Sequence, residues 1–405
     1  MKILVVASKI PWPPVDGGRI ATYEPMRHLT ACGHRIGFLG FGSQSTADEL
    51  RAHASLFFSR AIQHRTESDV FSAAWSLLSP LPYTAAKYRA GRMTAALREV
   101  FREEQFDLVQ LEGTHMAHYL AEIQRHGVPT VLRLHNVEAD LAQRYARTVK
   151  GPLRLFVEEQ ARRMRRFEMA ACRQASLCLA ITEEDAEIIR KRVPDAQVAV
   201  SPAGVDLERY APRPMSEEPG TVAFVGALDW PPNADSVRWF RSEIWPRIRA
   251  EEPTARWIVV GKGPSAEMLR WPEEDRSIIV TGYVDDVRKY LDVASVVVVP
   301  LRSGGGMRLK ILEALASAKP VVSTPLGAEG IAAQAGRDII LAPTAALMAS
   351  EVVRLLRAPA ERFRMGQNAR QAANHYGWGK IIQGQEEIYR QLISWNASSP
   401  APFRR

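Results

Sequence analysis

The chain has 405 residues, 46% of them hydrophobic, which is enough for two or three domains with large cores. Its formal net charge of +8 favours anionic partners such as a nucleotide-sugar, a lipid phosphate or a membrane surface, and no motif in it indicates nucleic-acid binding. Three cysteines without a C-x-x-C spacing predict no disulfide framework and a reducing, cytoplasmic location. No segment approaches the roughly 18 apolar residues of a membrane span.

The first half of the chain alternates short apolar runs with helical patterns, which is typical of a doubly wound α/β domain. The run Lys2–Ala7 (KILVVA) predicts the first strand. A proline-rich turn follows it, and a helix is expected from about Arg19 to Cys32. Later strands are predicted over residues 35–39, 106–111, 128–134, 176–181 and 198–200.

Several residues stand at positions where a doubly wound sheet binds its ligand. Gly17 and Gly18 precede Arg19 at the start of the first helix, where glycines let backbone N–H groups approach a phosphate or an acceptor. A tight turn alone would need only one glycine. The carboxyl ends of parallel strands face the ligand crevice, so polar residues that follow strands are further candidates. These are Glu112, His135, Asn136 and Glu138.

Two segments of the first half leave alternatives open. Residues 50–88 are expected to be irregular and carry many aromatic side chains, among them Phe57, Phe58 and Trp75. They could form a membrane-facing edge or an acceptor pocket, or they could pack in the core. The stretch Leu153–Cys172 predicts a basic amphipathic helix, whose charged face is either solvated or in contact with a membrane.

The second half begins after residues 206–220, a proline-rich and charged stretch that predicts an interdomain linker. Strands are expected over 221–225, 257–260 and 278–282. The loops that follow them contain Gly226, Asp229, Asn233, Lys262 and Tyr283. Residues from about 359 to 395 are expected to be helical.

The stretch Val296–Thr324 predicts a strand, a glycine turn, a helix and a second strand in succession. Four valines indicate a buried parallel strand, three glycines follow at 304–306, and the helix is expected from about Met307. A helix N-terminus carries unpaired N–H groups and a partial positive charge. Arg308 and Lys310 are therefore unfavourable in the first helical turn unless an anion is shared with them.

This stretch resembles the donor-nucleotide motif of family-4 retaining glycosyltransferases, which have the α/β GT-B fold of two facing Rossmann-like domains. The family motif has the form E-G-[FY]-G-x-x-x-x-E-A-x-A-x-G-x-P-V-[VI]. Glu313 stands at the second glutamate and Pro320 precedes the closing valines, whereas Gly305 replaces the first glutamate. In the family, the second glutamate accepts hydrogen bonds from the ribose, so the resemblance implies that role for Glu313.

A second departure from the family pattern concerns the diphosphate. The family's first-strand loop carries an arginine and a lysine, and here Ala227 and Asn233 stand in their places. The resemblance is thus to a subgroup with a G-G-G-M-R-L-K-x-x-E motif. Arg308 and Lys310 are expected to supply the missing charge.

The resemblance implies three sets of site residues and no metal. The catalytic set is His135, Arg308 and Lys310. The donor-binding set is Glu313, Gly304, Gly305, Gly306, Met307, Gly226, Asp229, Asn233, Lys262 and Tyr283. The acceptor or phosphate loop is formed by Gly17, Gly18, Arg19, Glu112, Asn136 and Glu138.

The implied organisation is an acceptor-binding domain over residues 1–205, the linker 206–220, a nucleotide-sugar-binding domain over 221–376 and a helix over 377–397 that packs back on the first domain.

The implied activity is metal-independent transfer of a sugar, with retention, from a UDP- or GDP-linked donor to a glycan or polyprenyl-diphosphate-linked acceptor. The expected setting is surface polysaccharide or glycolipid assembly, in the cytoplasm or on the inner face of the plasma membrane. No cofactor is expected, because the nucleotide-sugar is a substrate. The alternatives are a GT-B epimerase acting on a UDP-amino sugar and a catalytically silent nucleotide-sugar-binding partner.

Overall fold

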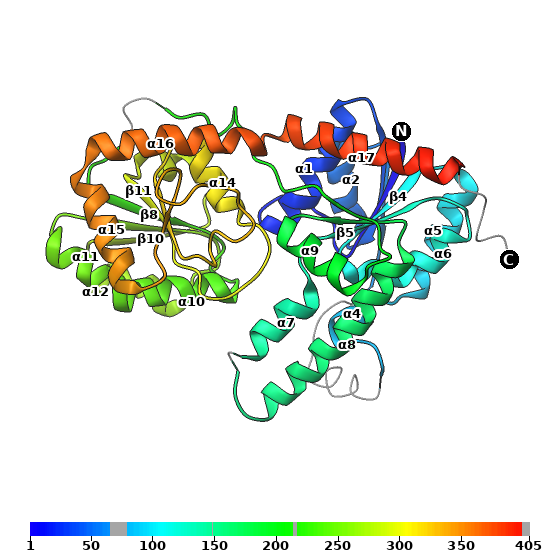
Figure 1. Ribbon diagram of the computed structural model, residues 1–405, viewed down its shortest axis with the longest axis horizontal. Coiled ribbons are helices and arrows are strands. Elements are labelled where there is room, and N and C mark those ends of the chain that lie inside the picture. The colour runs from blue at the N-terminus through cyan, green and yellow to red at the C-terminus, as the bar shows by residue number, and fades with distance from the viewer. Residues whose placement is uncertain (65–78, 148, 214–216, 399–405) are drawn as a thin grey trace. The chain divides into compact units, whose positions relative to one another are not determined.

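The computed structural model describes residues 1–64, 79–147, 149–213 and 217–398. The chain divides into two compact units, which are described separately (Figure 1). The first unit comprises Met1–Pro202 and the segment that begins at Ile381, and the second comprises Ala203–Lys380.

The first unit is built on a seven-stranded parallel sheet in the order β3-β2-β1-β4-β5-β6-β7. The strands are β1 (Lys2–Ala7), β2 (Arg35–Phe41), β3 (Phe58–Ile62), β4 (Leu108–Glu112), β5 (Thr130–Leu134), β6 (Leu177–Ala180) and β7 (Val198–Val200). The strand order reverses between β1 and β4, and ligands of doubly wound sheets bind at the carboxyl ends of strands beside such a reversal.

Helices cover the sheet of the first unit. They are α1 (Gly17–Ala31), α2 (Gln44–Ala54), α4 (Tyr83–Ala86), α5 (Gly91–Glu103), the 3₁₀ helix η2 (Thr114–Tyr119), α6 (Leu120–Gln124), α7 (Glu138–Ala146), α8 (Pro152–Gln174) and α9 (Glu183–Arg192). Helices α7 and α8 lie side by side as a hairpin that extends away from the sheet (Figure 1). The long C-terminal helix α17 (Trp378–Ser398) belongs to the first unit from Ile381 onward.

The second unit is built on a six-stranded parallel sheet in the order β10-β9-β8-β11-β12-β13. Its strands are β8 (Thr221–Val225), β9 (Arg256–Val260), β10 (Ile278–Gly282), β11 (Val296–Val299), β12 (Val321–Ser323) and β13 (Ile340–Leu341). Its helices are α10 (Pro231–Trp239), the π-helical turn η3 (Phe240–Ile244), α11 (Trp245–Glu251), α12 (Ala266–Glu274), α13 (Arg288–Val293), α14 (Leu309–Ala316), α15 (Ala345–Arg357), α16 (Pro359–Ala373) and the 3₁₀ helix η4 (Asn374–Tyr376). The expectation of two doubly wound α/β units is confirmed.

The prediction of an irregular segment over residues 50–88 is wrong for its described part. It contains the end of α2, the edge strand β3 and the short helix α4. Phe57 and Phe58 pack against the core of the first unit, which favours the core interpretation for these two residues. Residues 65–78, with Phe71 and Trp75, lie outside the described residues. In the described part of the chain, no helix is long and apolar enough to cross a membrane.

Candidate functional site

The turn between β11 and α14 depends on glycine. Gly304 and Gly306 have φ angles of 113° and 73°, which side-chain-bearing residues rarely adopt. Helix α14 begins at Leu309, so Arg308 is its N-cap residue and does not lie within the first turn as expected. The buried guanidinium of Arg308 donates through Nη1 to the carbonyls of Gly305 and Gly306. Part of this guanidinium therefore holds the turn in shape.

Lys310 lies in the first turn of α14 and contacts two neighbouring elements. Its ammonium donates to Oδ1 of Asn233 in α10 over 2.6 Å and lies 4.3 Å from the ring centroid of Phe224 in β8. A Cβ atom on Gly226 would lie 2.4 Å from Nζ of Lys310, so the lysine ammonium lies directly against the backbone of Gly226. The structure therefore brings together four predicted residues, Gly226, Asn233, Arg308 and Lys310. We call them the Lys310 cluster.

The Lys310 cluster carries excess positive charge. Burial, together with repulsion from Arg308, lowers the pKa of Lys310 to about 7, although the Glu313 carboxyl acts in the opposite direction. The positive end of α14 adds to this repulsion. A phosphate group placed here would stabilise the charged lysine.

Glu313 lies one turn farther along α14, and Tyr210 donates to its Oε1 over 2.8 Å. Burial raises the pKa of Glu313, while the Tyr210 hydrogen bond and the charges of Arg209 and Lys310 oppose that shift. Burial and the neighbouring carboxylate raise the pKa of Tyr210, so its hydroxyl stays protonated and can donate. The sequence analysis did not identify Tyr210.

The loops after β8 and β9 run together beside the Lys310 cluster. Leu228 donates its N–H to the carbonyl of Lys262 over 2.8 Å, and Lys262 forms an ion pair with Asp229 at 3.7 Å. A Cβ atom on Gly261 would lie 1.9 Å from the carbonyl oxygen of Gly226, so these loops touch backbone to backbone. Asp229 and Lys262, two of the predicted donor-binding residues, thus lie at this edge of the sheet.

Two predicted donor-binding residues are less closely integrated. Tyr283, after β10, is 61% exposed, and among the described residues no hydrogen bond or ion pair joins it to the Lys310 cluster. Met307 packs against the apolar core of the second unit.

In the first unit, Glu112 is the centre of a second group of polar residues. Glu112 ends β4 opposite Arg133 of β5, and His135 follows β5. His135 Nε2 lies 2.8 Å from Oε2 of Glu112, and Arg133 Nη1 lies 3.7 Å from Oε1. Thr22 of α1 donates to the same carboxylate over 3.3 Å, and Gln110 also donates to it. We call these five residues the Glu112 cluster.

The Glu112 carboxylate is ionised although it is buried. Burial by itself would raise its pKa, but the charge of Arg133 and the hydrogen bonds from His135 and Gln110 outweigh burial and lower the pKa. Glu112 is one of the residues predicted for the acceptor or phosphate loop, and the structure shows its carboxylate in contact with side chains of the first unit.

The predicted residues after β5 lie around the start of α7. Within the described part of the chain, the buried Oδ1 atom of Asn136 has no hydrogen-bond partner, so it could accept a bond from a ligand hydroxyl. The N–H of Glu138, at the start of α7, donates to Oε1 of Glu168 over 2.9 Å. Burial raises the pKa of Glu168 to about 7, with a further contribution from the Glu138 charge. Glu168 lies in α8, and the sequence analysis missed it.

Gly17, Gly18 and Arg19 form the N-terminal turn of α1. Asp16 caps this helix by accepting the N–H of Arg19 over 2.9 Å. The Arg19 guanidinium donates to the carbonyl of Pro13 over 3.2 Å. Thr22 contacts both the carbonyl of Gly18 and the carboxylate of Glu112, and this places the glycine pair beside the Glu112 cluster.

The structure offers no metal-binding group among the residues it describes, in the sense of three or more His, Cys, Asp or Glu side chains placed to hold an ion. Each unit thus carries one polar cluster at the carboxyl ends of its central strands. The Lys310 cluster is suited to a diphosphate, and the Glu112 cluster centres on a carboxylate that His135 contacts.

Comparisons with known proteins follow the same division of the chain. The sequence model described as "Glycosyltransferase Family 4" matches residues 15–209, and that described as "Glycosyl transferases group 1" matches residues 219–358. An uncharacterized 44.6 kDa protein in the cps region of Klebsiella pneumoniae is 20% identical over 362 residues, which are 87% of this chain and 90% of that protein. A D-inositol 3-phosphate glycosyltransferase of Streptomyces bingchenggensis is 29% identical over 250 residues, about half of each chain (54% and 53%).

Solved structures share the fold at low sequence identity. A sucrose-phosphate synthase from Thermosynechococcus elongatus superposes with a TM-score of 0.71 at 17% identity, covering 98% of this chain and all (100%) of that one. HepE from Anabaena, in complex with UDP and glucose, superposes with a TM-score of 0.67 at 14% identity, covering 96% of this chain and 99% of that one.

Proposed function

Given that the chain belongs to the family 4 retaining glycosyltransferases of GT-B fold, we propose that its acceptor is a hydroxyl of a glycan or of a polyprenyl-diphosphate-linked saccharide. Enzymes of this family transfer a sugar from a nucleotide-sugar. The proposed setting is surface polysaccharide assembly. The relative from a cps region supports that setting.

The observation that carries the proposed donor chemistry is the excess positive charge of the Lys310 cluster. Lys310 is held beside Arg308 at the positive end of α14, and its pKa is lowered to about 7 by burial and this repulsion. A nucleotide diphosphate supplies the missing negative charge. Breaking the bond between sugar and phosphate increases that charge, so Lys310 stabilises the leaving group most strongly in the transition state.

Glu313 is the proposed ribose ligand. Tyr210 donates a hydrogen bond to Oε1 of Glu313, and the second carboxylate oxygen can accept a hydrogen bond from a ribose hydroxyl. The UDP complexes of HepE support a UDP-linked donor for this chain. His135 is the proposed contact to the sugar, and departure of the phosphate on the face that the acceptor attacks would account for retention. No metal ion takes part in this proposal.

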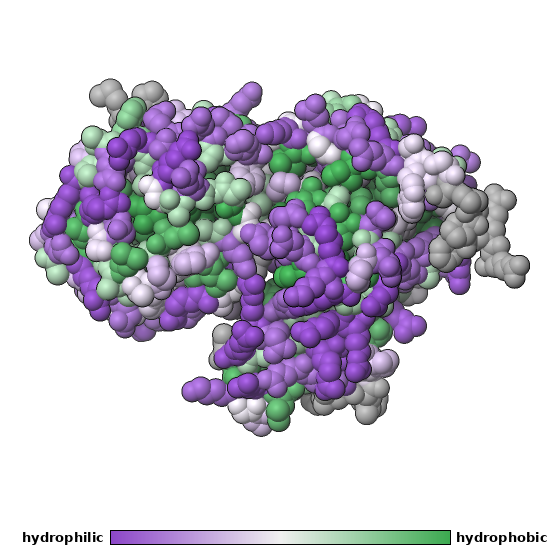
Figure 2. Space-filling model, in the orientation of Figure 1, coloured by the Kyte–Doolittle hydropathy of each residue, from purple (hydrophilic) through white to green (hydrophobic). Residues whose placement is uncertain are grey.

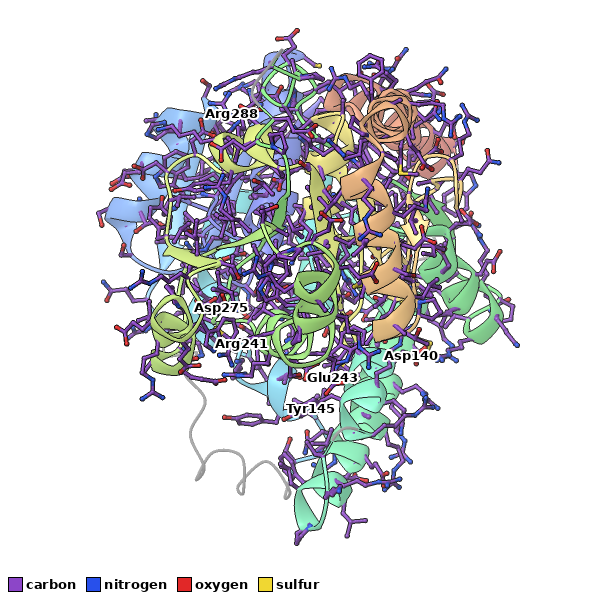
Figure 3. All side chains as sticks on the ribbon, turned by 90° about the vertical axis from the view of Figure 1, so that its left-hand side faces the viewer. Asp140, Tyr145, Arg241, Glu243, Asp275 and Arg288 are labelled. Carbon is purple, nitrogen blue, oxygen red and sulfur yellow. The ribbon has the colours of Figure 1, made fainter. Side chains whose placement is uncertain are left out.

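The α7–α8 hairpin is the proposed membrane contact. Leu153 and Leu155, at the start of α8, are 51% and 70% exposed, and Tyr145 near the end of α7 is 53% exposed. Figure 2 shows hydrophobic residues at the far end of the hairpin with hydrophilic ones around them, and Figure 3 shows Asp140 near its base and Tyr145 farther along. The exposed basic residues of this end are Arg147, Lys150 and Arg154. We call the three exposed apolar and three exposed basic residues of this end the hairpin tip: Tyr145, Arg147, Lys150, Leu153, Arg154 and Leu155.

Such a tip suits the inner face of a membrane. Leucine side chains enter the boundary between headgroups and acyl chains, while arginine and lysine pair with anionic headgroups. An acceptor anchored by a polyprenyl diphosphate lies in the same plane, so membrane contact would bring enzyme and acceptor together.

The test is incubation with a panel of UDP- and GDP-sugars, with and without a polyprenyl-diphosphate-linked saccharide, reading free nucleotide and the product. Acceptor-dependent nucleotide release with a new glycosidic bond supports the proposal. Acceptor-independent release with an epimerised sugar would identify the epimerase alternative. Binding of a nucleotide-sugar without turnover would identify a silent partner.

A further inference from the structure

A row of buried polar side chains connects the C-terminal helix to His135 within the first unit. Tyr389 of α17 contacts Oε1 of Gln110 through its hydroxyl, and Gln110 contacts Oε1 of Glu112 through its amide nitrogen. Glu112 Oε2 in turn contacts Nε2 of His135 at 2.8 Å. Tyr389, Gln110 and Glu112 are 0%, 2% and 4% exposed, whereas the His135 side chain is 22% exposed.

The direction of every hydrogen bond in this row follows from one charge. An ionised carboxylate only accepts, so the Gln110 amide must point its NH₂ group toward Glu112 and its oxygen toward Tyr389. The Tyr389 hydroxyl must then donate to Gln110, and the amide of Gln385 on the same helix donates to that hydroxyl. At the other end of the row, His135 must carry its proton on Nε2 in order to donate to Glu112.

Burying these groups costs free energy that an apolar core would not cost. A fully hydrogen-bonded polar row, however, holds each of its members in one orientation. His135 is the only member of the row that is partly exposed. The row therefore fixes the orientation of the His135 imidazole ring, which a ligand can reach.

We propose that Glu112 is a positioning residue that fixes His135 as the Nε2–H tautomer, and that Tyr389 of the C-terminal helix holds Glu112 in place through Gln110. The Nδ1 atom of His135 is then a hydrogen-bond acceptor for a hydroxyl of the sugar or the acceptor. This inference rests on the proposed function for the role of His135, but the tautomer and its cause are properties of the protein alone.

The direct test is ¹⁵N spectroscopy of the histidine-labelled protein, whose nine histidines include His135. The His135 signal is assigned by its loss in His135→Gln. Wild type should show the Nε2–H form. Glu112→Gln should lose the single tautomer, because an amide can donate to the ring as well as accept from it. Nδ1–H in wild type, or an unchanged Nε2–H form in Glu112→Gln, would overturn the proposal.

Kinetics provide the second readout. Glu112→Gln should lower kcat by roughly 10²-fold, the low end of what an oriented proton-transfer or hydrogen-bonding group contributes, with little change in donor KM. Tyr389→Phe should lower kcat less, by about tenfold, and shift the His135 signal. The matched control is Tyr119→Phe, which removes another buried tyrosine hydroxyl of the first unit, one that bonds the backbone of residues 88 and 90.

The outcomes separate the inference from the proposed function. Equal effects of Tyr389→Phe and Tyr119→Phe would show that α17 acts only through stability, and would overturn the role of Tyr389 even if Glu112→Gln failed to fold. Full activity of His135→Ala would contradict the proposed role of His135, whereas the spectra would still decide whether Glu112 sets its tautomer.

Discussion

Lys310 donates to Asn233 over 2.6 Å, and the two residues come from helices that follow different strands of one sheet. The resemblance to the family places Asn233 where the family carries a basic residue. Asn233, which is neutral where the family has a charge, therefore contacts Lys310, which is charged where the family has no charge. This contact connects two departures from the family pattern that lie 77 residues apart in the chain.

Lys310→Ala should lower kcat by roughly 10²-fold or more, the scale observed when a preorganised electrostatic donor is lost. The donor KM should change less, because the charge on the leaving phosphate is largest in the transition state. Steady-state kinetics with one confirmed donor measure this, with Lys289→Ala as the control for loss of an exposed lysine from the same unit. Near-normal kcat in Lys310→Ala would place the clamp elsewhere, with Lys262 and Arg19 as the next candidates.

Donor binding should take up a proton at pH 8. The pKa of Lys310 is about 7 in the free protein, and a bound diphosphate favours the ammonium and so raises that pKa. Affinity for a nucleotide-sugar should therefore be constant below about pH 7 and fall as pH rises above it, by up to about tenfold per pH unit. Calorimetry in two buffers with different heats of ionisation measures the proton uptake.

Lys310→Met provides the control for this pH dependence. It should bind the donor more weakly and show neither the proton uptake nor the fall in affinity above pH 7. Uptake that persists in Lys310→Met would assign the proton to another group.

Glu313→Ala should weaken nucleotide binding by about 1.5–3 kcal/mol, because one or two charge-assisted hydrogen bonds to the ribose are lost. Tyr210→Phe should weaken it by about 1 kcal/mol, since the carboxylate stays but one of its oxygens is no longer held. Titration calorimetry with UDP and GDP measures both, and thermal melts show whether the fold survives. Unchanged affinity in Glu313→Ala would contradict the ribose assignment.

The sequence predicts the regular part of the structure because its signals are local. A run of four valines, three glycines and an amphipathic helix occupy consecutive positions, so the β11–α14 unit and its charged residues can be inferred from spacing alone. The carboxyl ends of β4 and β5 can be inferred in the same way, and with them Glu112 and His135. The edge strand β3 was missed because its side chains are only partly buried and show no clear period.

The contacts that complete the two clusters could not be predicted, because their partners are distant in the chain. Tyr210 meets Glu313 across 103 residues, and Tyr389 meets Gln110 across 279. A tyrosine in a linker or a C-terminal helix carries no local signal of its partner. Glu168 was missed for a related reason, since a glutamate in an arginine-rich helix is normally solvated.

Stability should fall as pH rises from about 5 to 8 because of Glu168. The pKa of this carboxyl is about 7 in the folded protein and lies near 4.5 when unfolded, so the folded state binds the extra proton between these values. The contribution of Glu168 to the free energy of unfolding is fully present below pH 4.5 and is lost as pH passes 7. Its size is on the order of 3 kcal/mol. Glu168→Gln should reduce this fall.

Thermal melts at pH 5, 6, 7 and 8 measure the effect. The matched control is Glu159→Gln on the same helix, whose carboxylate pairs with Arg163 and has a lowered pKa, so its removal should leave the fall between pH 5 and 8 in place. Parallel curves for wild type and Glu168→Gln would assign the pH dependence to other groups.

The hairpin tip should bind anionic but not neutral vesicles, and salt should abolish the binding. Each basic residue near an anionic leaflet contributes about 1 kcal/mol, and this attraction is screened by salt. The double variant Leu153→Ser/Leu155→Ser should weaken co-sedimentation by roughly tenfold or more, because two exposed leucines no longer enter the lipid. Phe363→Ser removes an apolar side chain of equal exposure, 70%, from α16 of the second unit, and it should bind as wild type does.

Vesicle binding distinguishes contact through the hairpin tip from non-specific attraction of the whole basic chain to an anionic membrane. Since the chain carries a net charge of +8, non-specific attraction would survive the leucine substitutions unchanged. Loss of binding in the double variant, with normal turnover of a water-soluble acceptor, would assign the membrane contact to the hairpin. Equal binding of wild type to neutral and anionic vesicles, or to neither, would contradict it.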